Sequence, residues 1–188
     1  MSRTKLIKIP KHITIIYDKK KRYLIIIGPI KTKSIRVELK LKIIKKLNCI
    51  GVTCNSFKKM SNNDSRNVKA LQGTIEALIK KSFIEVTYLI YKKLKLVGVG
   101  YKVLMANNFD SKLLILKLGL SHPLYFKIPE TLKVVSLKLT KLFVYGTSYQ
   151  EVSQISSIIR SYKKPEPYKG KGFLYDNEKI ILKEGKKV

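Results

Sequence analysis

The sequence LFVYGTSYQEVSQISSIIRSY, residues 142–162, predicts a strand that leads directly into a helix. The apolar run Leu142–Tyr145 is typical of a buried strand, and a glycine follows it. Ser148 and Glu151 have the three-residue spacing of a capping box, which marks the beginning of a helix. Beyond them, one helical face is apolar and comprises Val152, Ile155, Ile158, Ile159 and Tyr162. This part of the chain therefore ends in a helix that can cover a sheet.

Short apolar segments upstream of this stretch predict the strands of that sheet. We expect strands over residues 93–105, 113–118, 124–128 and 132–139. A polar turn at 107–111 joins the first two.

The first half of the chain follows the same order of strands and then a helix. Segments 13–17 and 23–27 predict a hairpin, and residues 35–43 alternate between apolar and charged side chains. Strict alternation predicts a strand with one buried face. After a polar stretch at 61–65 that offers helix N-caps, one helical face carries Val68, Leu71, Ile75, Leu78, Ile79 and Ser82.

This repetition predicts an α+β fold of two tandem small domains. Each domain has an antiparallel-rich sheet packed with one helix, and a basic C-terminal tail follows. We expect the limits at residues 1–91, 92–164 and 165–188.

The net charge is the most unusual property of the sequence. Forty Lys and Arg residues against 12 Asp and Glu residues give +28, and the excess is spread along the whole chain. Such a chain repels itself when folded, so its natural partner is a polyanion such as nucleic acid.

Other classes of function find little support in the sequence. No apolar run approaches the ~18 residues of a membrane span. Cys49 and Cys54 form one isolated C-x4-C pair, so we expect free thiols rather than a zinc site. Gly98 and Gly100 give an incomplete dinucleotide fingerprint, and on a strand such glycines permit close backbone approach instead. Because no catalytic constellation has a supporting spacing, we expect no enzyme activity, cofactor, metal or small-molecule substrate.

The strongest chemical signal is RSYKKPEPYKGKGF, residues 160–173. Pro165 and Pro167 stop the helix and stiffen its exit, and glycines beside lysines let backbone N–H groups approach phosphate. Tyr168 can stack on a base or ribose. A solvated, flexible basic tail is the alternative, but the apolar residues from Phe173 to Leu182 do not suit it.

The stretch Pro165–Gly172, reached through Ile159-Arg160-x-x-Lys163, resembles the C-terminal signature of the universal large-subunit ribosomal protein six family, of the bacterial or organellar type. Other segments agree with this family in order. They are Lys8-Ile9-Pro10, Gly28-Pro29, Gly73-Thr74, Gly98-Val99-Gly100-Tyr101, Leu118–Pro123 and Ile128-Pro129.

The resemblance implies a structural, non-catalytic constituent of the large ribosomal subunit with tandem α+β domains. It also implies binding to large-subunit ribosomal RNA near the docking site of translation factors, beside neighbouring large-subunit proteins. The rRNA-binding residues carried over by motif are Arg160, Lys163, Lys164, Tyr168, Lys169, Gly170, Lys171 and Gly172, followed by Lys102 and His122. His122 could equally be a turn residue bonded to backbone.

The sequence departs from the family pattern at three positions and over residues 44–64, which match it poorly. Glu85 and Leu89 stand where the family usually has two glycines. Lys163 replaces an arginine, which keeps the positive charge but loses the bidentate fork.

The compartment is inferred less directly. The family match begins within ten residues of Met1, which leaves no room for an import presequence, and the Lys- and Ile-rich composition without Trp suggests an AT-rich genome. We therefore expect a mitochondrial ribosome, with a plastid or a bacterial cytoplasm as alternatives.

A rival function is a peripheral membrane protein that holds anionic lipid through polybasic patches. Such a protein would need a basic amphipathic helix with exposed apolar groups. We expect no membrane partner, because both predicted helices use their apolar faces on the sheets.

Overall fold

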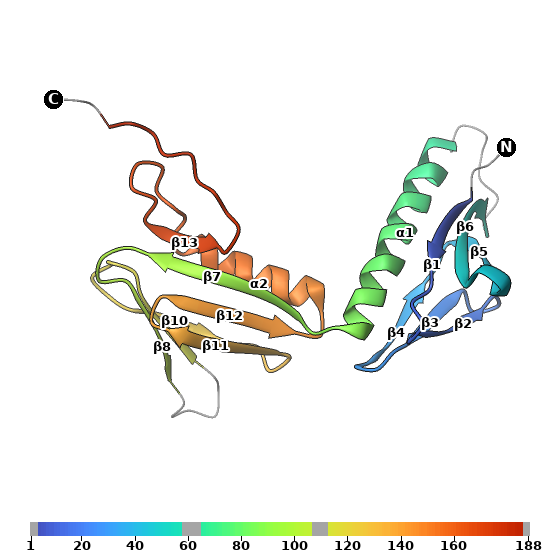
Figure 1. Ribbon diagram of the computed structural model, residues 1–188, viewed down its shortest axis with the longest axis horizontal. Helices are drawn as coiled ribbons and strands as arrows, with labels where there is room; N and C mark the ends of the chain where they lie inside the picture. Colours follow the sequence, from blue (N-terminus) through green and yellow to red (C-terminus); the bar gives the residue numbers. More distant parts are fainter. Residues whose placement is uncertain (1–3, 58–64, 107–112, 186–188) are drawn as a thin grey trace. The chain divides into compact units, whose positions relative to one another are not determined.

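The computed structural model describes residues 4–57, 65–106 and 113–185 (Figure 1). The chain divides into two compact units, residues 1–88 and 89–188. All strand pairings within the described residues are antiparallel, so the predicted α+β class is confirmed. The domain limits expected at 91 and 164 stay predictions. Of the polar stretch expected to offer N-caps at 61–65, residues 61–64 lie outside the described residues, and Ser65 is the first residue of the helix. The polar turn expected at 107–111 also lies outside the described residues.

Six described strands and one long helix make up the first unit. The strands are β1 (Lys5–Lys8), β2 (Thr14–Asp18), β3 (Tyr23–Ile27), β4 (Thr32–Arg36), β5 (Leu39–Ile44) and β6 (Cys49–Ser56), and a 3-10 turn covers Lys45–Leu47. They form two sheets of order β2-β3-β4 and β1-β6-β5. The helix α1 (Ser65–Thr87) buries Ile75, Ile79, Phe83 and Val86 in the core of this unit.

The strand expected over residues 35–43 is two strands in different sheets. β4 ends at Arg36 and β5 begins at Leu39, and between them the N–H of Val37 donates to the carbonyl oxygen of Arg22 at 2.8 Å. Val37, Leu39 and Leu41 are all buried. The alternation therefore identified the buried face correctly for these three residues, but Ile35 is half-buried, Ile43 is exposed, and the chain changes sheets within the stretch. In α1, Leu78 is exposed rather than part of the core.

The second unit again has two sheets and one helix among its described residues. Its strands are β7 (Ile90–Val97), β8 (Lys102–Ala106), β9 (Leu113–Lys117), β10 (Leu124–Lys127), β11 (Leu132–Lys138), β12 (Lys141–Gly146) and β13 (Gly172–Tyr175). The sheets have the orders β10-β9-β8 and β11-β12-β7-β13. The helix α2 (Tyr149–Ser161) lies along β7 and β12 (Figure 1).

The strand expected over 93–105 is interrupted by a glycine turn. β7 ends at Val97, and Gly98 and Gly100 have positive φ angles of 147° and 77°. A Cβ atom at Gly98 would lie 2.5 Å from the Tyr101 ring. The glycines therefore permit a close approach of this ring to the backbone, in a turn rather than within a continuous strand.

The C-terminal tail is partly integrated into the second unit. β13 pairs with β7 in the register Phe173↔Leu96, and the Phe173 side chain is fully buried in the core with Val152 and Ile159 of α2. A wholly flexible tail is therefore wrong for these residues, because an apolar side chain holds the strand in the sheet.

Candidate nucleic-acid interface

The helix α2 delivers the chain to the candidate site. Ser148 is its N-cap residue with extended backbone angles, as the sequence predicted, but its side chain makes no capping hydrogen bond. Val152 and Ile159 anchor one face of α2 in the core. This packing fixes the last turn, which carries Arg160.

Residues 163–172, which we call the tail loop, are closed by backbone hydrogen bonds. The N–H of Phe173 donates to the oxygen of Lys163, and the N–H of Glu166 donates to the oxygen of Lys171, both at 2.9 Å. The N–H of Lys183 donates to the oxygen of Pro167, also at 2.9 Å. The loop is therefore held from both of its ends and by the segment that follows β13.

The tail loop exposes a tyrosine and two of its four lysines. Lys164 and Lys169 are exposed, and Tyr168 is 53% exposed, whereas Lys163 and Lys171 are half-buried. The loop thus offers a stacking ring and ammonium groups to a partner without needing to rearrange.

Two glycines serve the geometry of the loop itself. Gly170 has a φ of 66°, and its N–H donates to the oxygen of Glu166 at 2.9 Å. Gly172 has a φ of 142°, and a Cβ atom there would lie 2.7 Å from the oxygen of Lys164 and 2.8 Å from that of Lys163. The backbone crosses itself at Gly172 too closely for any side chain. The predicted contact of these two glycines with RNA stays a prediction.

Arg160 is bound within the chain. Its Nε donates to Oε2 of Glu178 at 3.2 Å, and its Nη2 donates to Oε1 of the same carboxylate. Burial raises the pKa of Glu178, but the hydrogen bonds from Arg160 and from the N–H of Tyr175 outweigh burial, so the pKa lies below its ordinary value. The guanidinium also lies over the Tyr175 ring, 5.5 Å from its centroid. Sequence reasoning missed this anchor, because nothing along the chain links Arg160 to Glu178.

Lys102 and His122 lie outside the tail loop. Lys102 is exposed at the start of β8, and His122 is exposed in the turn before β10, with its Nδ1 3.4 Å from Oγ of Ser121. Tyr101, the residue before Lys102, packs its ring against the turn that contains His122. A Cβ atom at Gly119 of that turn would lie only 2.8 Å from the ring. The other eight predicted residues all lie within residues 160–172, whereas these two belong to the neighbouring three-stranded sheet and the turn before β10.

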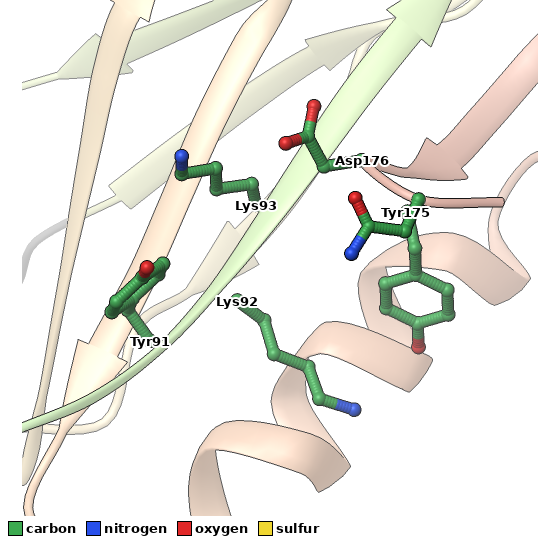
Figure 2. A pocket seen from close by; sticks show the side chains of 6 residues that line it. Tyr91, Lys92, Lys93, Tyr175 and Asp176 are labelled. Carbon is green, nitrogen blue, oxygen red and sulfur yellow. The ribbon is translucent and has the colours of Figure 1, made fainter.

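Two hollows lie beside β7. One has a volume of about 490 Å³ and is lined by Tyr91, Lys92, Lys93, Tyr175, Asp176 and Asn177 (Figure 2). The second has a volume of about 540 Å³ and is lined by Leu89, Tyr91, Lys93, Val135, Leu137, Phe143 and Tyr145. Sequence reasoning missed them, although the alternation of Tyr91, Lys93 and Lys95 along one strand was a usable signal.

The described residues were compared with the requirements of a membrane-spanning helix and of a metal site. No helix among them is long and apolar enough to cross a membrane. They also contain no group of three or more His, Cys, Asp or Glu side chains placed to hold a metal ion.

Comparison with known proteins now identifies the class to which this arrangement belongs. The family model described as Ribosomal protein L6 matches residues 97–176, a range that contains every predicted rRNA-binding residue. The class is therefore that of ribosomal proteins.

Individual relatives extend the similarity over nearly the whole chain. The chain is 38% identical over 182 residues to the large ribosomal subunit protein uL6 of Mycoplasmoides gallisepticum, and the alignment covers 97% of this chain and 93% of that protein. It is 41% identical over 161 residues to the uL6 protein of Mycoplasma genitalium, which covers 85% and 82% of the two chains. For the uL6 protein of Variovorax paradoxus, the identity is 43% over 125 residues, with 66% and 68% covered. The chain belongs to the uL6 family.

The family assignment confirms the resemblance seen in the sequence, and the bacterial relatives support its bacterial type. The family is a structural class of ribosomal proteins, which fits the expectation of a non-enzyme. These relatives support a location on the ribosome but give no support to a mitochondrial one.

Proposed function

We propose that the chain is a structural constituent of the large ribosomal subunit that binds large-subunit rRNA through the tail loop, near the docking site of translation factors. One observation carries this proposal: the exposed Lys164, Tyr168 and Lys169 stand on a loop closed by its own backbone hydrogen bonds. A preorganised loop loses little backbone conformational entropy when it binds, which lowers the free-energy cost of binding.

The lysines of the loop act on the phosphate backbone. Each lysine that neutralises a phosphate releases condensed counterions, which makes binding dependent on salt. Lysine is a flexible point charge, so these contacts position the protein without reading sequence. Specificity then comes from the match between the RNA shape and the rigid loop, with Tyr168 placed to stack on a base or ribose.

Arg160, Lys102 and His122 are proposed as additional contacts. Two of the five guanidinium N–H groups of Arg160 are used by Glu178, so three remain for a phosphate while the pair holds the tail in place. Lys102 and His122 extend the surface onto the three-stranded sheet, where both are exposed.

The proposed partners are large-subunit rRNA and the large-subunit proteins beside it, with no membrane or small-molecule substrate. For the compartment we propose a bacterial cytoplasm, because an AT-rich bacterial genome accounts for the Lys- and Ile-rich composition as well as a mitochondrial one does. The genome that carries the gene decides between them.

The proposed function is tested by the salt dependence of RNA binding. The full chain is titrated with a transcript of the factor-docking region of large-subunit rRNA at several salt concentrations. The double variant Lys169→Gln/Lys171→Gln should reduce the log–log salt slope by about 1.4 to 1.8, since each lost phosphate contact removes about 0.7 to 0.9.

The matched control is Lys19→Gln/Lys20→Gln, which removes the same charge from exposed positions in the turn between β2 and β3. It should change the slope far less than the tail variant. Equal slopes for the tail variant and the wild type would contradict the assignment of the tail loop. Purified large subunits that lack the chain would contradict the proposed function as a whole.

A further inference from the structure

The face of the β11-β12-β7-β13 sheet that points away from α2 carries a cluster of aromatic rings. Tyr91 of β7 is directly opposite Tyr145 of β12, and Phe143 is opposite Lys93. The residues that alternate with them, Leu94, Leu142 and Val144 among others, are buried in the core with α2. Because successive side chains of a strand point to opposite faces, the three rings share the outer face.

The two hollows described above meet on this face. Both are lined by Tyr91 and Lys93, and the larger one also contains Phe143 and Tyr145. Figure 2 shows Lys92 and Lys93 leaving β7 in different directions, with Asp176 and Tyr175 at the end of β13. An apolar hollow floored by aromatic rings therefore adjoins a polar hollow in which Lys93 supplies the ammonium group on this face. Lys92 points to the α2 side of the strand, where its Nζ lies 6.0 Å from the centroid of the Tyr149 ring.

The charge of this sheet has one sign. The strands β7, β11 and β12 contain no Asp or Glu, and their lysines are Lys92, Lys93, Lys95, Lys133, Lys138 and Lys141. Asp176, which follows β13, is paired with Lys95 at 2.8 Å. The positive charge and the aromatic rings of this surface are thus complementary to a polyanion that also has flat apolar groups.

We propose that this face binds an unpaired nucleotide segment of RNA, with a base stacked in the apolar hollow and a neighbouring phosphate at Lys93. This inference rests on the proposed function and adds the chemical class of RNA that the second unit takes. A duplex keeps its bases stacked on one another, so only an unpaired base can offer its face to Tyr91.

The position of Lys93 allows a bound base to displace its ammonium group from the aromatic rings. Its Nζ lies 5.6 Å from the centroid of the Tyr91 ring and 5.3 Å from that of Phe143. A stacked base gains more from an aromatic ring than an exposed ammonium does, so the base displaces the ammonium from the ring. The flexible side chain of Lys93 can then turn toward a phosphate in the adjoining hollow.

The test compares unpaired and paired RNA on the full chain. Fluorescence anisotropy measures the affinity for a labelled single-stranded RNA decamer and for a duplex of equal length. The double variant Tyr91→Leu/Phe143→Leu keeps the charge and the apolar character of the face but removes two stacking rings. The affinity for the single strand should fall about tenfold, and the affinity for the duplex should stay unchanged.

Two controls separate this inference from other effects. Tyr125→Leu removes an equally exposed tyrosine from β10, outside this face, and should leave both affinities unchanged. Circular dichroism and urea unfolding establish that the double variant is folded. If the double variant loses no affinity for the single strand, or loses as much for the duplex, the inference is overturned.

A second measurement uses assembled large subunits containing 4-thiouridine in the rRNA. Photo-cross-links should appear on the peptides of β7 and β12 that carry Tyr91 and Phe143. Cross-links from these peptides to a neighbouring protein, with none to RNA, would overturn the inference in favour of a protein partner. If the tail variant loses its salt slope while the sheet variant behaves as wild type, only this inference fails and the proposed function stands.

Discussion

The guanidinium of Arg160, in the last turn of α2, donates hydrogen bonds to both carboxylate oxygens of Glu178. Oε2 of Glu178 also accepts a hydrogen bond from the N–H of Tyr175 at 3.1 Å. The Glu178 carboxylate therefore links the segment after β13 to the end of α2. The two segments that flank the tail loop are thus held by the same Arg160–Glu178 ion pair.

Glu178→Gln should loosen the tail loop without unfolding the second unit. The change keeps the shape of the side chain but removes the charge, so the free energy of unfolding should fall by about 1 kcal/mol. Urea denaturation measures this fall, and limited proteolysis should show faster cleavage within residues 163–183. Glu184→Gln, at an exposed position of the same tail, serves as the control and should change neither.

The Arg160–Glu178 pair should also make stability depend on pH in the acid range. Because the pKa of Glu178 lies below its ordinary value of 4.5, the pair contributes fully above that value. Its contribution is lost as the pH falls through the lowered pKa, when the folded state must take up a proton. The unfolding free energy should therefore decrease below about pH 4.5, and this decrease should be smaller in Glu178→Gln. An identical pH profile for the two proteins would show that Glu178 is not the titrating group.

Gly172→Ala should disrupt the crossing point of the tail loop. A Cβ atom would lie within 2.8 Å of two carbonyl oxygens, at a φ of 142° that alanine rarely adopts. The cost should be about 2 kcal/mol or more in unfolding free energy, and Phe173 should leave the core more readily. Gly185→Ala adds the same methyl group where no atom lies within 4 Å, so it should be neutral. Equal stability of both variants would contradict the close approach.

Lys33→Met should destabilise the first unit. The Glu85 side chain is 1% exposed and forms ion pairs with Lys33 of β4 and, at 3.9 Å, with Lys31. Removing the nearer cation leaves a buried carboxylate with weaker compensation, at a cost of about 2 kcal/mol. Lys31→Met should cost less, because its ammonium is farther from the carboxylate. Thermal unfolding of both variants measures this order, and the reverse order would contradict the assigned pairing.

The Lys33–Glu85 contact also explains a departure from the family pattern. The sequence has a glutamate where the family usually has glycine, and the structure buries this glutamate beside two lysines. The sequence alone could not indicate this pairing, because β4 and the end of α1 are far apart along the chain.

The sequence predicted those features that depend on near neighbours. Alternation identified the buried residues Val37, Leu39 and Leu41, and helical spacing located α2 with its N-cap at Ser148. The motif Pro165–Gly172 predicted the family, which the relatives confirm. Period and spacing are set by the backbone geometry of a single element, so a short stretch of sequence contains them.

The tertiary structure alone decided how distant segments meet. It placed the change of sheets at Val37, the pairing of Phe173 with Leu96, the carboxylate of Glu178 against Arg160, and the aromatic face around Tyr91. Each of these depends on which strand or helix packs beside which, and many residue pairs of suitable chemistry compete for such contacts. Close packing of the folded core selects among them, and no local pattern records that selection.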